Sequence, residues 1–588
     1  MTTRPIALLF LAAALAAQDP EPPRVMHVYD LGALSAGMRS WFFDTVDVTE
    51  REFSLLGISH QVEGQREGDS VDEQDPGRAE MAAEIVRACV GPIEGFEVEP
   101  IAEGHQLLVT GTEADHKTVV RVVEQLRAAG DPPVELDVRH LTILDRSLDD
   151  AARAALLAPG KLSAEQLAAL ARFDSRSGRQ GGVLEVAVGR WGVFRAVREL
   201  RYVPDFNVEI AQGAAIADPV PAISADGLKA AVRPFLLRDG RLLLRVVASM
   251  GDREGEPRRV ALGAQEATDL LRLRNTDFGE VEQIDYRGGA VSTEAIVAPG
   301  EMATIVLATD ARGELRWDVL ALTVKAAPKP IVADTFVVAP VGALVTEDAP
   351  RRVVWNGTTG ELALAPLETG PRLALESVLH RIGFPADGEG EFKTGDEHLH
   401  GGSLLLRGRA ASLRAANEGI LALERELIRP AQIEIRFVAE RPGGAARAVG
   451  LLAAPLTAGR VAALAAYLRM DTIGDYEVEV AQEARIADPV HEVVTAGVFG
   501  NALVYANADG TYRLHLDLTV AGATEAIRTI ASGVGGVPIL QSVALAKRVA
   551  PLRLDVAAGR PRSVDLGQDP FSRAEEGRLS AVVTVHPQ

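Results

Sequence analysis

Apolar residues recur with a helical period in the first part of the chain. Residues 112–126 place an apolar side chain at the i, i+3, i+4 and i+7 positions of one helix face, namely Val119, Val122, Val123 and Leu126. Thr112 and Asp115 precede this stripe with the spacing of a capping box. Residues 134–141 (VELDVRHL) then alternate apolar and polar side chains, which indicates a half-buried strand. With strands expected at 27–31, 96–101 and 106–109 and a helix at 79–90, the order predicts a small β-α-β-β-α-β domain.

The pattern changes to many short strands after residue 182. Asp239-Gly240 between two apolar runs is typical of a β-hairpin turn, and Asp509-Gly510 repeats it. Gly-rich turns separate the runs, so this part is expected to be antiparallel and rich in strands. The expected strands are 183–188, 206–210, 228–235, 242–248, 295–297, 304–307 and 317–324.

The chain contains a tandem duplication. Residues 206–220 (FNVEIAQGAAIADPV) and 476–490 (YEVEVAQEARIADPV) are identical at ten of fifteen positions. The copies are 297 residues apart at Gly111 and Gly408 but 270 apart at Val208 and Val478, so the second copy is 27 residues shorter between these points. Because both flanks are retained, we interpret the flanks as the folding units and the lost segment as a connector.

The two copies, called the first and second repeat, define the predicted organisation. The fold class is α+β, with each repeat consisting of a small βαββαβ domain followed by an antiparallel β-rich core. The helices expected at 372–382 and 413–427 of the second repeat correspond to those at 79–90 and 112–126 of the first. The predicted division is 1–17 signal peptide, 25–132 and 133–327 for the first repeat, 328–352 linker, and 353–429 and 430–588 for the second.

The N-terminus resembles an export signal. Arg4 precedes an apolar run at 6–13, and Ala14-Leu15-Ala16 supplies small residues for cleavage, so the mature chain is expected to begin near Ala17 or Gln18. The run is shorter than the roughly 20 residues of a membrane-spanning helix. Cys89 is the single cysteine, which excludes an internal disulfide, and its apolar helical context predicts a buried side chain.

Composition and charge exclude some classes of function. With 588 residues, several domains are expected. A formal net charge of −21 argues against a protein that binds nucleic acid through its phosphates, because such proteins concentrate Lys and Arg. No Gly-x-Ser-x-Gly elbow and no Walker-type phosphate loop occur in the sequence. The sequence therefore predicts neither an enzyme nor a cofactor.

Both repeats resemble the secretin family, the ring-forming outer-membrane channels of type II and type III secretion. The run LLVTGTEADHKTVVRVVEQLRAAGDPPVELDVRHL is similar to the periplasmic N-domains of secretins, and LLLRGRAASLRAANEGILALERELIRPAQIEIRFV is a looser version. YVPDFNVEIAQGAAIADPV followed by LKAAVRPFLLRDGRLLLRVVA resembles part of the secretin core, as does VPILQSVALAKRVAPLRLDVAAGRPRSVDLG. The chain departs from the family in having two short cores, and it lacks a Pro-Gly gate hairpin and an amphipathic lip.

The resemblance implies an exported protein of the periplasm or outer membrane that acts by oligomeric assembly in protein secretion or transport. It implies partners among copies of the chain itself or other envelope proteins, and it leaves open membrane association through an oligomeric β-barrel. One alternative is a periplasmic or cell-surface scaffold that is derived from secretins and forms no pore. The other is a metal-dependent enzyme.

Few side chains suggest a site. His398 and His400 form a His-x-His pair that a zinc site would use, although a solvated hairpin is the preferred interpretation. Asp-Pro pairs recur in both repeats, and we interpret them as the points where a strand ends and turns. Glu209, Gln212 and their counterparts are expected on the solvent or subunit side of that strand. The predicted assembly motif is Glu209, Gln212, Asp218, Pro219, Glu479, Gln482, Asp488 and Pro489.

Overall fold

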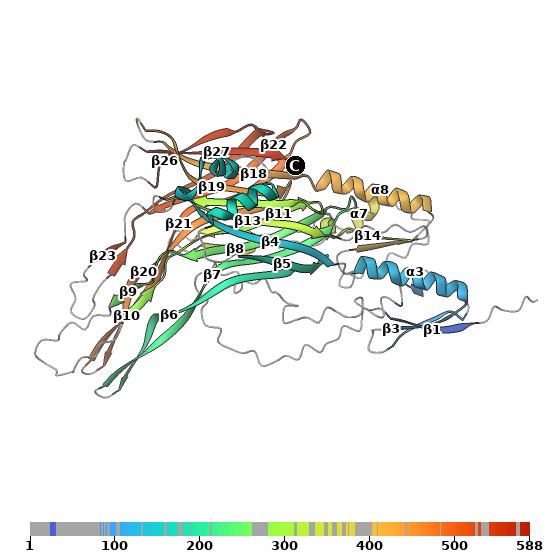
Figure 1. Ribbon diagram of the computed structural model, residues 1–588, viewed down its shortest axis with the longest axis horizontal. Coiled ribbons are helices and arrows are strands. Elements are labelled where there is room, and N and C mark those ends of the chain that lie inside the picture. The colour runs from blue at the N-terminus through green and yellow to red at the C-terminus, as the bar shows by residue number, and fades with distance from the viewer. Residues whose placement is uncertain are drawn as a thin grey trace, which may run out of the picture.

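The computed structural model contains two large antiparallel sheets with smaller α/β units at one end (Figure 1). It describes residues 24–30, 95–101, 106–130, 133–157, 162–174, 180–189, 191–211, 214–261, 280–310, 314–327, 336–345, 351–355, 362–366, 372–373, 375–382, 403–407, 410–440, 444–481, 484–523, 527–530, 540–571 and 577–588, and the single positions 83, 86, 87 and 90.

Each large sheet has eight strands, four from each repeat. The first sheet has the order β25-β22-β21-β20-β11-β8-β7-β6 and consists of Leu545–Ala557, Thr511–Ala523, Ala484–Ala506, Val461–Ala481, Tyr286–Val297, Leu242–Arg253, Ala214–Leu236 and Gly192–Ala211. The second has the order β26-β27-β18-β19-β12-β13-β4-β5 and consists of Arg562–Gln568, Arg578–Pro587, Pro430–Glu440, Arg447–Thr457, Met302–Thr309, Arg316–Ala326, Pro133–Leu144 and Gln180–Ala187.

The main core lies between these sheets. Alternate residues of both sheets meet there, so that Val246 and Ala295 of the first sheet share one apolar cluster with Leu320 and Ile433 of the second. Because the cluster contains residues of both repeats without interruption, the two β-rich parts form one sandwich. The antiparallel, strand-rich prediction is confirmed.

The first small unit combines a three-stranded sheet with a helix. Its sheet has the order β1-β3-β2 (Val25–Asp30, Gln106–Gly111 and Glu97–Ile101), and α3 spans Glu113–Gly130. The capping box forms as predicted, because the Thr112 N–H donates to Asp115 Oδ2 at 2.8 Å and the Asp115 N–H donates to Thr112 Oγ1 at 3.4 Å. The expected last strand of this unit is instead β4 of the second large sheet, because its buried residues pack into the main core.

The second small unit includes part of the predicted linker. β14 (Phe336–Pro340) pairs with β17 (Ser403–Arg407), and α6 (Gly342–Val345), α7 (Leu375–Arg381) and α8 (Ala410–Leu427) accompany them. β15 (Arg351–Trp355) pairs with β16 (Leu362–Pro366). Part of 328–352 is thus regular structure, although it lacks a strong hydrophobic period; the division into domains remains a prediction. In Figure 1, α3 and α8 lie at the same end of the sheets.

The segment missing from the second repeat is more than a connector. After β4 the chain forms α4 (Asp150–Leu157) and α5 (Ala164–Leu170), with 3-10 turns at Asp145–Ser147 and Ala171–Phe173. Leu156 and Leu167 pack with Trp317 of the first repeat and Leu451 of the second on the outer face of the second sheet. The interpretation of this segment as a non-folding connector was wrong, because its apolar stripes are buried against both repeats.

The repeated 15-residue segment forms the far part of long hairpins that extend beyond the sandwich (Figure 1). β7 continues through Asp218 and Pro219, which lie opposite Asn207 and Phe206, and β21 likewise continues through Asp488 and Pro489. The expectation that Asp-Pro ends the strand was wrong. Among the described strands, this part of β7 pairs with β6 alone, because the pairing with β8 begins at Gly227. Proline is tolerated on such an unshared strand edge. Shorter hairpins pair β9 (Arg258–Ala261) with β10 (Glu280–Gln283) and β23 (Arg528–Ile530) with β24 (Leu540–Ser542).

Candidate assembly interface

The two repeats join in the same head-to-tail order in both sheets. In the first sheet β20, the first long strand of the second repeat, pairs with β11, the last strand that the first repeat contributes. In the second sheet β19 pairs with β12 in the same sense. We call these two pairings the repeat seam. Such a heterologous contact uses different surfaces on its two sides, so each end of the sandwich has an edge that could repeat it.

The register identifies equivalent positions in the two repeats. Gly300, after β11, donates its N–H to the Val324 carbonyl at 2.8 Å, and Gly559, after β25, donates to Val585 at 2.8 Å. β25 pairs with β22 in the register that β11 has with β8. β11 at the seam and β25 at the end of the sheet are therefore the same strand in two environments.

The seam side of β11 carries small or buried residues. All positions of β11 are buried. A Cβ on Gly289 would lie 2.6 Å from Leu307 Cδ1 and 3.2 Å from the Ala465 carbonyl oxygen, so a side chain at this position would force Leu307 to shift and would crowd the backbone of the second repeat. Ala290 opposite Ala465 continues this small-residue contact. The seam closes as tightly as a protein interior.

A buried carboxylate joins three parts of the molecule beside the seam. Arg245 of β8 donates its Nε–H to Glu294 Oε1 at 3.1 Å, and Arg372, in the second small unit, donates to Glu294 Oε2. Thr457 at the end of β19 also donates to Glu294 Oε2. Burial opposes ionisation of Glu294, but Arg372 and Arg245 outweigh it and lower its pKa to about 2. Glu294 is therefore a charged junction between both cores and the second small unit.

The second small unit rests on an apolar surface of the first repeat. This docking surface consists of Phe235, Leu237, Leu243 and Ile296, which share a buried cluster with Leu344 and Ile420 among others. At its edge, Glu424 of α8 accepts the Arg238 N–H at 2.9 Å through Oε2. Burial raises the pKa of Glu424 to about 8, against the lowering effect of this N–H and of the Arg238 charge. Glu424 is thus held uncharged at neutral pH.

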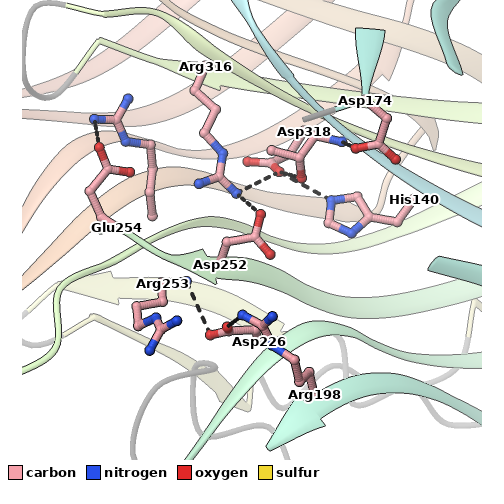
Figure 2. A network of polar contacts seen from close by, with 11 residues as sticks. His140, Asp174, Arg198, Asp226, Asp252, Arg253, Glu254, Arg316 and Asp318 are labelled. Carbon is pink, nitrogen blue, oxygen red and sulfur yellow. Dashed lines mark hydrogen bonds and ion pairs between the residues drawn. The ribbon is translucent and has the colours of Figure 1, made fainter. Parts of the chain in front are cut away.

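The first repeat also contains a polar network between its two sheets (Figure 2). His140 Nε2 lies 3.2 Å from Asp318 Oδ1, and the Thr142 hydroxyl donates to the same oxygen at 2.9 Å. Arg316 donates to Asp252 Oδ2 at 2.9 Å and thereby connects the second sheet to the first. Nearby, Asp226 Oδ2 accepts a hydrogen bond from Arg198 Nη2 at 3.0 Å, and Asp226 Oδ1 accepts from the Arg253 N–H at 3.1 Å. Figure 2 shows both interactions as dashed lines.

This network is absent from the equivalent described positions of the second repeat. Phe437 occupies the place of His140, and Leu579 that of Asp318, and both are fully buried. Gly522 occupies the position in the second repeat that is equivalent to Asp252. A His–Asp pair could in principle move a proton, but Asp318 already accepts from Thr142 and lies beside Arg316, so we interpret the cluster as a structural connection between sheets.

The predicted site residues are only partly placed. The register puts Glu209 opposite Ile216 and Glu479 opposite Ile486, at the far part of the hairpins. Gln212, Gln482, Cys89, His398, His400 and the predicted signal peptide lie outside the described residues. The described residues contain no group of three or more His, Cys, Asp or Glu side chains that could hold a metal ion. The sequence analysis did not predict the seam, because no single residue identifies it. The seam could be found in the sequence only by aligning the two repeats and noting that equivalent strands differ in side-chain size and charge.

Comparisons with known proteins gave structural matches only. No family model and no curated protein matches the chain. Among the helices of the described part, none is long and apolar enough to cross a membrane.

The solved structures to which the chain is similar include several secretins. The secretin domain of InvG from the Salmonella SPI-1 injectisome has 12% identity and a TM-score of 0.20, with 53% of this chain and 90% of that chain covered. GspD in a pilotin–secretin complex with AspS from ETEC has 11% identity and a TM-score of 0.18, covering 54% and 77%. The V. cholerae competence pilus secretin PilQ has 8% identity and a TM-score of 0.14, covering 99% and 81%.

Proposed function

We propose that this protein is an exported, secretin-like component of the cell envelope that acts by assembly in protein secretion or transport. The single observation that supports this most is the head-to-tail joining of the repeats in both sheets. It leaves β6 and β5 at one end and β25 and β26 at the other, and within the described residues no further strand joins either large sheet beyond them by backbone hydrogen bonds. A second copy of the chain is the natural partner, because the seam is already a contact of the required kind.

The predicted chain-to-chain contact has a definite register. Since Ala290 lies opposite Ala465 at the seam, the equivalent Val549 of one chain would lie opposite Arg195 of the next. A disulfide between cysteines at these positions therefore tests the proposal. The variant R195C/V549C is compared with A290C/A465C, both in a Cys89→Ala background so that no other thiol is present.

The internal pair serves as the matched control for geometry. A290C/A465C should oxidise within one chain at every protein concentration, without changing the mass on a denaturing gel. R195C/V549C should give covalent dimers and larger species as concentration rises, with rings or arcs in negative-stain images. Single particles and no covalent oligomers at any concentration, in buffer or detergent, would refute assembly through this edge.

The pore-free scaffold remains a second candidate. It is favoured by the composition of β25, where Lys547, Pro551 and Arg553 are exposed on an edge strand. Lysine, other charged residues and proline on an edge are the usual means by which proteins discourage further strand pairing. A chain that stays single while binding another envelope protein would support the scaffold.

A further inference from the structure

The two ends of the sandwich are not copies of the two sides of the repeat seam. Where β11 has Gly288 and Gly289, β25 has Lys547 and Arg548. Pro551 replaces Ser292 and has no N–H to give to a neighbouring strand. The seam sequence is small and neutral, whereas its counterpart at the end is basic and interrupted.

The opposite end differs from the seam in the same direction. At the seam, β20 presents Ala465 and Leu468, which are buried. Their equivalents on β6 are Arg195 and Arg198, both exposed. Joining β25 of one chain to β6 of another would thus bring two stretches of net positive charge together, and it would desolvate side chains that now face water.

Arg548 forms a hydrogen bond of its own at the end of the sheet. It donates from Nη2 to Gln568 Oε1 of β26 at 3.1 Å and so connects the two sheets across the open end of the sandwich. At the counterpart position of the seam, Gly289, a side chain would displace Leu307 and crowd the Ala465 carbonyl. Repeating the seam between chains requires this arginine to leave its partner.

The docking surface for the small unit is also missing from the second repeat. In place of Phe235, Leu237, Leu243 and Ile296 stand Tyr505, Asn507, Arg513 and Asp555. Tyr505 is 43% exposed, and Arg513 Nε lies 3.2 Å from Asp555 Oδ1 in an exposed ion pair. An incoming chain's first small unit would find a hydrated surface here instead of an apolar one.

The outer cover of the seam is likewise confined to the first repeat. α4 and α5 pack on β12 and on β19, the two strands that meet at the seam in the second sheet. In the second repeat, the described residues between β18 and β19 contain no such helices. A chain-to-chain contact through β26 lacks this cover.

We infer that the contact between chains is a weakened version of the repeat seam, so that the two-repeat chain is the permanent unit and further copies add reversibly. This inference rests on the proposed function, and it names Lys547, Arg548 and Pro551 as the residues that limit strand addition at the C-terminal edge. Because both facing edges are basic, association should strengthen with ionic strength, opposite to the behaviour of an attractive ion-pair interface.

The test restores the seam sequence at the end of the sheet. The variant K547G/R548G/P551S carries the residues of β11 at these positions. The control variant R414A/R425A removes two exposed positive charges from α8, in the second repeat but outside both large sheets. Sedimentation velocity over a concentration series, at low and high salt, measures association of full-length mature protein. The restored variant should associate at a protein concentration at least tenfold lower than wild type or R414A/R425A.

Each outcome separates the inference from the proposed function. If wild type already assembles as tightly as the restored variant, and R195C/V549C oxidises between chains at the lowest concentration, assembly stands and the inference fails. If neither protein associates and R195C/V549C never oxidises between chains, the proposed function and the inference both fail. Association of wild type that weakens with salt would also overturn the inference. Circular dichroism melting of each variant establishes that it folds.

Discussion

The equivalent strands β11 and β25 carry very different side chains, because β11 lies inside the sheet at the repeat seam and β25 lies at its end. β11 is buried throughout and presents glycine and alanine to β20. β25 alternates exposed with partly buried residues over most of its length and presents Lys547, Val549 and Pro551 at the end of the sheet. The strand pairing has the same register in both repeats, whereas the side chains differ according to what lies beside each strand. The difference indicates that the seam and the ends have separate roles.

The same contrast extends into the interior. The first repeat joins its sheets by ion pairs and hydrogen bonds around Asp318, whereas the second places Phe437 and Leu579 at equivalent positions. Both sets of side chains fill the space between the two sheets, but the polar side chains must be paired with one another when buried, whereas the apolar side chains need no hydrogen-bond or ionic partners. Exchanging residues between equivalent positions of the two repeats tests whether each residue depends on its surroundings.

The largest effect is expected from Gly289→Arg, which places the residue of β25 at the seam. Its Cβ would meet Leu307 and the Ala465 carbonyl, and the guanidinium would be buried without a planned partner. We expect a loss of about 4 kcal/mol in the free energy of unfolding, measured by urea titration. Arg548→Gly is the matched control and should cost less than about 1 kcal/mol, because that side chain lies at the open end. Equal losses would mean that the two strands are equivalent after all.

Glu294→Gln is expected to cost about 3 kcal/mol, because it leaves Arg245 and Arg372 buried without their counter-charge. The pKa of Glu294 is lowered from 4.5 to about 2 in the folded protein, so its stabilising contribution is complete above pH 4.5 and is lost as the pH falls toward 2. Urea unfolding at pH 7 and pH 3 should show a smaller difference between variant and wild type at pH 3. Arg553→Gln, at the equivalent position of β25, should change neither value; a difference that does not depend on pH would contradict the ionic role.

Asp318→Leu is expected to cost about 2–3 kcal/mol, because it leaves His140 and Arg316 buried beside a leucine. Adding His140→Phe, the other residue taken from the second repeat, should recover part of the loss. A double-mutant cycle in urea measures this coupling. Additive losses would indicate that the network is not a single unit. Phe437→Leu in the second repeat is the control for a simple change of packing.

The smallest effect is expected from Glu424→Gln at the docking surface, about 2 kcal/mol of stabilisation at pH 9 and little change at pH 5. The pKa of Glu424 is raised from 4.5 to about 8 when folded. Folding is therefore favoured most below pH 4.5, and this advantage is lost as the pH rises toward 8. Thermal unfolding at both pH values measures the effect. A variant with the same pH dependence as wild type would show that Glu424 is hydrated.

Much of the local structure follows from the sequence. The apolar stripe that includes Val119 and Val122 specifies α3, because it gives the helix one face to bury. The capping box at Thr112 fixes where the helix begins, because it supplies hydrogen bonds to backbone N–H groups of the first turn. The hairpin at Asp239-Gly240 follows from turn chemistry, with Gly240 at a φ of +85° that favours glycine. The duplication and the strand-rich class are likewise readable, since both depend only on residue order.

Which strands are neighbours depends on long-range packing. The sequence does not distinguish a strand at an edge from one at a seam, because Gly289 and Arg548 both fit a β-strand and differ only in what lies beside them. The transfer of β4 to the second large sheet and the continuation of β7 through Pro219 depend on pairings with segments distant in the chain. Local pattern thus determined the elements of this protein, while long-range packing determined where one repeat ends and where a second chain could begin.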